Sequence, residues 1–152
     1  MADSIEKAAG ASARRTSALP WRTVGLVVGD AVSFLVFAGL GRNQHGEASG
    51  LGALGQIALT AVPFALGWFL VSPWVGVYRR QLTNTVRRMA SRTELAWLAS
   101  YPVALILRVL IAPDHQMPWT FALVILLANA LLLGAWRSAF GFVERQVARS
   151  RA

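Results

Sequence analysis

Long apolar stretches alternate with short polar ones along the chain, and four of the apolar stretches are long enough to cross a bilayer. A helix needs about 20 residues to cross ~30 Å of hydrocarbon, because it rises ~1.5 Å per residue. Lipid offers no water to backbone polar groups, so isolated apolar runs of this length form helices. The pattern predicts an all-α, polytopic membrane protein, a bundle of four transmembrane helices, with spans at about residues 22–41, 52–77, 95–112 and 118–137.

Polar segments divide the chain around these spans. Residues 1–20 are polar and rich in Ala and Ser, and we expect a mobile cytoplasmic segment there. Residues 21–138 make up the predicted membrane domain, and residues 139–152 a basic cytoplasmic tail. The connection at residues 78–93 is long and basic enough to form a surface helix. Three prolines inside predicted spans are expected to bend their helices without ending them: Pro63, Pro73 and Pro102.

Lysine and arginine are distributed unequally between the two sides of this predicted bundle. Of the 15 in the chain, all but two lie in the N-terminal segment, the middle connection and the tail. The two short turns contain only Arg42, and Arg108 falls inside the third span. Basic residues are retained on the cytoplasmic side of membrane helices. Both termini are therefore expected in the cytoplasm.

Composition agrees with a membrane protein and excludes several other classes. Hydrophobic residues make up 55% of the chain and charged residues 14%, and the mean hydropathy is +0.49. The absence of cysteine excludes disulfides, thiol nucleophiles and thiolate metal sites. The net charge of +8 comes from segments that flank the spans, which favours anionic lipid headgroups over nucleic acid as the partner. The expected headgroup contacts in the middle connection are Arg79, Arg80, Arg87, Arg88 and Arg92.

Several short motifs occur in an order that resembles the domain-of-unknown-function family numbered 3054, over about residues 22–140. The motifs are Gly29-Asp30, Gly41-Arg42-x-x-His45-Gly46, Pro63-Phe64-x-x-Gly67-Trp68, Leu107-Arg108 and Trp136-Arg137. This resemblance implies a small prokaryotic integral protein of the cytoplasmic membrane, for which no activity is assigned.

Asp30 lies inside the first span, and each other span contains a polar residue at a similar predicted depth. Counted from the inner boundary, Asp30 and Asn129 lie ~12 Å deep, and Ser72 and Tyr101 lie ~10 Å deep. An ionised carboxylate in hydrocarbon costs at least ~2.5–3.5 kcal/mol, so Asp30 is expected to face the interior and to accept hydrogen bonds or stay protonated. Two interpretations stay open. Asn129, Tyr101 or Ser72 donates to Asp30 in a structural polar layer, or Asp30 has a solute-linked or proton-linked role.

A second group of candidates is expected at the opposite, outer face: Arg42, His45, Arg108 and His115. Two histidines could ligate a metal if their turns met, but neither turn has the spacing of a metal site. A structural role suits His45 better, with hydrogen bonds that hold its turn while Arg42 meets lipid phosphate. Arg108 is ~21 Å from the inner boundary, so it either extends to the outer headgroups or lines a cavity that accepts an anion. The sequence implies no metal and no cofactor.

Small residues form a stripe along the first span: Gly25, Gly29 and Ser33. Such a stripe permits close approach of another helix, either within the bundle or in a second copy of the chain.

Three classes of function follow from these features. The first is a small membrane protein that binds or moves a small solute or lipid-like ligand through polar groups in the bundle interior. The alternative is a non-catalytic membrane subunit or assembly factor that packs against a partner complex. An enzyme is least supported, because no paired carboxylates, metal cluster or nucleophile beside a base can be assembled on one side of the membrane.

Overall fold

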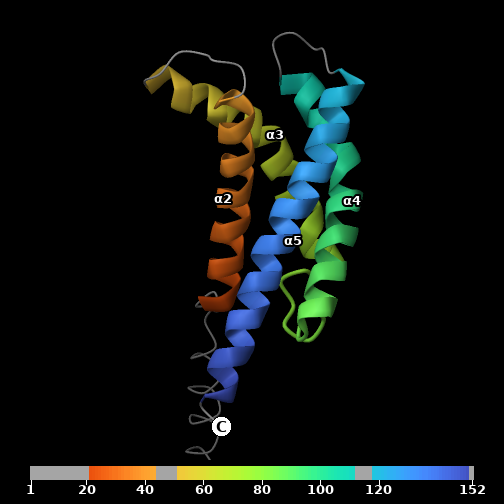
Figure 1. The fold of residues 1–152 in the computed structure, drawn as a ribbon. Helices are drawn as coiled ribbons and strands as arrows, with labels where there is room; N and C mark the ends of the chain where they lie inside the picture. Colours follow the sequence, from red (N-terminus) through yellow and green to blue (C-terminus); the bar gives the residue numbers. More distant parts are fainter. Residues whose placement is uncertain (1–20, 44–50, 112–117, 151–152) are drawn as a thin grey trace, which may run out of the picture.

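The computed structural model describes residues 21–43, 51–111 and 118–150, and these residues form four long α-helices (Figure 1). Each helix contains a stretch long and apolar enough to cross a membrane. The all-α, four-span architecture expected from the hydrophobic pattern is therefore confirmed. The helices are α2 (Trp21–Asn43), α3 (Leu51–Val75), α4 (Val86–Ile111) and α5 (Trp119–Arg149).

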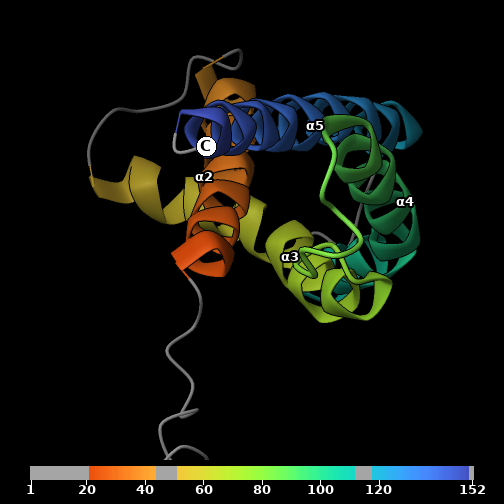
Figure 2. The ribbon, with the colours of Figure 1, turned by 90° about the horizontal axis from the view of Figure 1, so that it is seen from below.

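The four helices form a ring, seen along the bundle in Figure 2. Within the described residues, α2 packs against α3 and α5, α4 packs against the same two helices, and the diagonal pairs do not pack backbone to backbone. Large aromatic side chains fill the space between the diagonally opposite helices. The Phe34 ring on α2 lies 6.5 Å from the Trp68 ring on α3 and 5.8 Å from the Trp97 ring on α4. All three side chains are buried, and they form the centre of the core.

The helix α3 changes direction along its length (Figure 1), as expected for a helix with internal prolines. Pro63 and Pro73 remove backbone donors without ending it. Between the two prolines, Gly67 lets α3 approach α4 closely, because a Cβ at this position would lie 2.8 Å from the Cα of Ala104. This contact places the second half of α3, with Trp68, against the bundle interior.

The connection between α3 and α4 folds as turns over residues 76–85, and α4 begins at Val86. Gly76 starts the turns with φ of +79°, a conformation that favours glycine. The Thr85 hydroxyl accepts the Arg88 backbone N–H, which satisfies one free donor at the start of α4. The surface helix expected at residues 78–93 is thus replaced by turns and by the first two turns of α4.

At one end of the ring, α2 and α4 begin and α3 and α5 end. We call it the arginine-rich end, because it contains Arg22, Arg79, Arg80, Arg87, Arg88, Arg145 and Arg149. The helix α5 continues to Arg149, beyond the predicted end of its span, and its residues 145–149 are exposed.

Candidate functional site

Asp30 on α2 and Arg137 on α5 form an ion pair in the bundle interior. Arg137 Nε donates to Asp30 Oδ1 at 2.9 Å, and Arg137 Nη2 donates to Asp30 Oδ2 at 2.5 Å. Both side chains have 0% exposure. Two parallel hydrogen bonds between a guanidinium and a carboxylate give the strongest geometry for such a pair. Each charge therefore has its counter-charge in a place that excludes water.

Other groups complete the surroundings of this pair. Trp68 Nε1 and Tyr78 Oη donate to Asp30 Oδ2 at 3.0 and 2.9 Å, so the carboxylate accepts four hydrogen bonds. Arg137 Nη1 donates to the Val77 carbonyl at 3.1 Å. The Arg137 guanidinium also lies 5.2 Å from the centre of the Trp68 ring and 4.9 Å from that of Tyr78, within the range of cation–π attraction. The cluster joins α2, α3, the turn and α5.

Tyr78 lies in the turn outside the helices and acts as a donor in this cluster. Burial raises the pKa of its phenol, and the nearby Asp30 carboxylate raises it further. The Ser72 hydroxyl lies close to the phenol. The phenol therefore stays protonated throughout the neutral pH range, and its O–H donates a hydrogen bond to Asp30.

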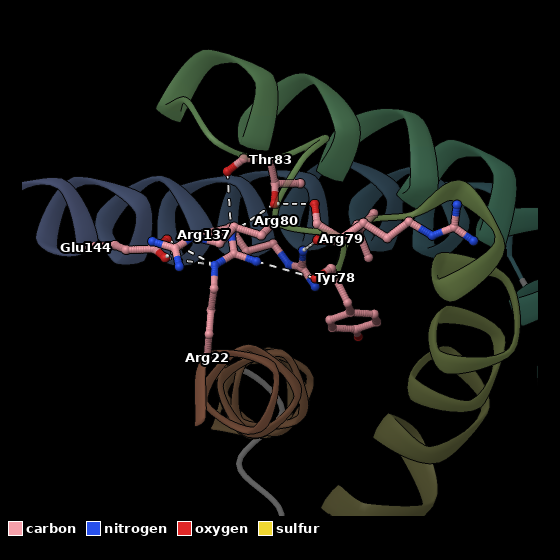
Figure 3. A network of polar contacts seen from close by, with 8 residues as sticks. Arg22, Tyr78, Arg79, Arg80, Thr83, Arg137 and Glu144 are labelled. Carbon is pink, nitrogen blue, oxygen red and sulfur yellow. Dashed lines mark hydrogen bonds and ion pairs between the residues drawn. The ribbon is translucent and has the colours of Figure 1, made fainter. Parts of the chain in front are cut away.

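A second ion pair joins the same two helices nearer the arginine-rich end (Figure 3). Arg22 Nε on α2 lies 3.0 Å from both carboxylate oxygens of Glu144 on α5. Arg22 Nη2 also donates to Thr83 Oγ1 at 2.8 Å, and Nη1 to the Tyr78 carbonyl at 3.4 Å. The Arg22 and Glu144 side chains are 12% and 29% exposed, so this pair is closer to solvent than Asp30–Arg137.

An apolar groove of about 540 Å³ lies between α2 and α5, on the side of their contact that faces away from the two ion pairs. The small-residue stripe forms part of its lining. A Cβ on Gly29 would collide with the Trp136 indole, and one on Gly25 would lie 3.2 Å from the Phe140 ring. The Ser33 hydroxyl donates to the Gly29 carbonyl at 2.9 Å. The groove is lined by Trp21, Val24, Gly25, Val28, Gly29, Val32, Ser33, Val36, Leu132, Ala135 and Trp136.

The predicted donors to Asp30 are wrong. Asn129 Nδ2 donates to the Ile125 carbonyl on its own helix at 3.2 Å, and Tyr101 Oη donates to the Ala122 carbonyl of α5 at 2.6 Å. The buried Ser72 hydroxyl has no hydrogen-bond partner among the described residues. Depth on the last span was counted from Arg137 as its inner end, but α5 continues to Arg149. Arg137 therefore lies at the level of Asp30, next to the Trp136 that packs on Gly29.

The expected outer-face group falls largely outside the described residues. His45 and His115 lie there, as does the side chain of Arg42. Arg108 is partly exposed, and its buried Nε has no hydrogen-bond partner in the part of the chain that the structure describes. The described residues contain no group of three or more His, Cys, Asp and Glu side chains that could hold a metal.

Four of the five arginines expected at lipid headgroups lie at the arginine-rich end, and Arg92 lies one turn farther along α4. Arg79, Arg80, Arg87 and Arg88 are exposed, whereas Arg92 is partly buried and donates to the Val75 carbonyl at 3.2 Å. Sequence reasoning missed the roles of Arg22, Trp68, Tyr78, Arg137 and Glu144. One signal was present. Arg22 and Asp30 are two helical turns apart, and so are Arg137 and Glu144, which matches opposite charges on antiparallel helices.

Comparison with known proteins places the chain in a family. The model of a family described as a protein of unknown function (DUF3054) matches residues 27–140. The match covers most of the chain, and the chain belongs to this family. Searches among curated proteins and among solved structures found no match.

Proposed function

For this DUF3054 member, we infer that the protein binds one membrane amphiphile without catalysis, holding an acyl chain in the groove between α2 and α5. The observation that carries the proposal is the groove itself, about 540 Å³ in volume and apolar over nearly all of its lining. This volume is within the range of sites that hold small organic ligands. A ligand with a long apolar part fits such a lining, and a hydrophilic solute does not.

The length of the groove also suits an acyl chain. Its lining on α2 extends from Trp21 to Val36, 15 residues along a helix, or ~22 Å. One leaflet contributes about half of the ~30 Å hydrocarbon layer. A chain that lies along α2 through one leaflet would therefore occupy about 15 Å of the groove, with its headgroup level with the arginine-rich end. Charge complementarity favours an anionic headgroup.

The buried polar groups support a lipid-like ligand over a polar solute. Asp30 and Arg137 neutralise one another and bind Trp68, Tyr78 and the Val77 carbonyl. Their hydrogen bonds and both ion pairs hold α2 against α5, which maintains the wall of the groove. We propose that the arginine-rich end faces the cytoplasm, as the positive-inside rule requires for both termini.

Native mass spectrometry of the full chain, extracted in mild detergent, tests the proposal. We expect one retained lipid molecule per chain. Val32→Trp places a large ring in the groove and should abolish retention. Leu35→Trp is the matched control, because Leu35 is on the same helix, is 47% exposed against 49% for Val32, and does not line the groove.

Other results would contradict the proposal. Equal retention in wild type and both variants would place the lipid elsewhere. A protein partner retained in place of lipid, and lost in Val32→Trp alone, would favour the alternative of a non-catalytic subunit or assembly factor whose partner helix covers the groove.

A further inference from the structure

A polar pocket of about 170 Å³ lies at the arginine-rich end, between the turn after α3 and the last part of α5. It shares no lining residue with the apolar groove. Its lining contains two arginines, one glutamate and three polar side chains of the turn. The lining residues are Arg80, Thr83, Asn84, Thr85, Gly141, Glu144, Arg145 and Ala148.

The charges of this pocket do not cancel. Glu144 is its one acidic lining residue, and Arg22 binds both oxygens of that carboxylate at 3.0 Å. Arg80 Nε lies 3.7 Å from Glu144, but the Arg80 side chain is 76% exposed, and an exposed pair at this distance is weak. Within the described residues, Arg145 has no ion-pair partner. The pocket therefore presents two guanidinium groups whose charge is largely uncompensated.

Neutral donors lie beside these guanidinium groups. Asn84 Oδ1 accepts from Arg88 Nη1 at 3.2 Å, which turns the amide oxygen to Arg88 and leaves the amide NH₂ as a donor. The Thr85 oxygen accepts the Arg88 backbone N–H, so its O–H remains available to donate. Thr83 is already used, because its hydroxyl accepts from Arg22 and donates to the Arg79 carbonyl.

Size limits the ligand. A water molecule occupies about 30 Å³ in the liquid, so the pocket has room for roughly six waters. It is smaller than the ~300 Å³ at which sites for drug-sized ligands begin. A tetrahedral oxyanion with a few waters fits this space, and guanidinium groups match its oxygens in pairs.

We propose that this pocket binds a phosphate group, held by Arg80 and Arg145 with Asn84 and Thr85 as neutral donors. Inorganic phosphate, a soluble phosphate monoester and the headgroup of phosphatidic acid all present this chemistry. The proposal does not depend on the lipid proposed for the groove, because the two sites have separate linings.

Titration calorimetry on the full chain, reconstituted in nanodiscs of zwitterionic lipid, tests the pocket. Inorganic phosphate is the first probe, and nanodiscs doped with phosphatidic acid are the second. The double variant Arg80→Gln/Arg145→Gln should weaken binding of the preferred probe at least about tenfold. The matched control Arg87→Gln/Arg149→Gln makes the same change of charge at exposed arginines outside the pocket and should stay within about twofold of wild type.

The two probes separate the sources of the phosphate. Saturable binding of free phosphate that is lost only in the pocket variant identifies a soluble ligand. Binding of phosphatidic acid alone, with the same dependence on the pocket variant, identifies a lipid headgroup. The proposal fails if neither probe binds saturably, or if both double variants weaken binding equally, because the effect would then be one of net charge.

Discussion

Trp136 on α5 lies so close to Gly29 on α2 that position 29 has no room for a side chain. The small-residue stripe of α2 is therefore used within the bundle, at the contact with α5. The apolar groove lies beside this contact, between the same two helices, and both Gly29 and Trp136 form part of its lining.

Gly29→Ala should destabilise the protein, because even one methyl group collides with the Trp136 indole. Overpacking of this kind costs about 1–3 kcal/mol of unfolding free energy. Gly39→Ala is the matched control on the same helix, where an added Cβ meets nothing within 4 Å. Thermal unfolding in detergent compares the two, and equal midpoints would show that α5 moves away from α2 without cost.

Removing one partner of the buried ion pair should lower the free energy of unfolding far more than removing both partners. Asp30→Leu leaves the Arg137 guanidinium buried and unpaired, and Arg137→Leu does the same to Asp30, each at about 3–5 kcal/mol of unfolding free energy. The double variant Asp30→Leu/Arg137→Leu should be more stable than either single variant. Denaturant-induced unfolding in detergent measures this coupling. If the double variant lost as much unfolding free energy as the sum of the two single-variant losses, the pairing would be contradicted.

Asp30→Asn separates this ion pair from the neutral polar layer expected from the sequence. An amide keeps the shape and several hydrogen bonds of the carboxylate, and a neutral layer would tolerate it. In the structure the change leaves the Arg137 charge without a counter-charge, so a large loss of stability is expected. A near-normal unfolding midpoint for Asp30→Asn would favour the neutral layer.

The stability of the protein should fall in alkali through Tyr78. Burial raises the folded-state pKa of this phenol above its unfolded value of about 10. Its contribution is then fully present below pH ~10 and is lost as the pH rises toward the folded-state pKa, because the unfolded chain releases the proton first. Tyr78→Phe should unfold more easily than wild type at pH 8, and its stability should fall less steeply above pH ~10. Parallel curves for the two proteins would contradict this assignment.

Cysteine labelling tests the proposed orientation, since the chain contains no native cysteine. Gln116→Cys should react with an impermeant thiol reagent in intact cells, whereas Thr85→Cys and Ser150→Cys should react only after lysis. Labelling of Thr85→Cys in intact cells would reverse the orientation.

Hydropathy was sufficient to predict the fold, because the cost of exposing backbone to lipid leaves few structures for apolar runs of this length. It was insufficient for the connection after α3. Hydropathy describes a charged segment as outside the bilayer, but it does not tell a separate surface helix from the first turns of a transmembrane helix. The start of α4 at Val86 follows from local chemistry, the Thr85 cap and the Gly76 turn.

The candidate site was predictable only in part. The cost of a carboxylate in hydrocarbon predicts that Asp30 faces the interior, and Asp30 is fully buried. Its partner was missed because Arg137 was counted as a boundary residue by the same rule that gave the orientation. The role of Tyr78 depends on how the turn folds back against the bundle, and hydropathy carries no information about that contact.

The buried ion pair also places a condition on synthesis. Asp30 and Arg137 are separated by 107 positions and belong to the first and last spans, so the carboxylate is made long before its counter-charge. At about 5–20 residues per second, roughly 5–20 s pass before Arg137 leaves the ribosome. During that interval the first span must stay at the interface, bind a chaperone or carry Asp30 protonated, and α2 takes its final place only when the last span arrives.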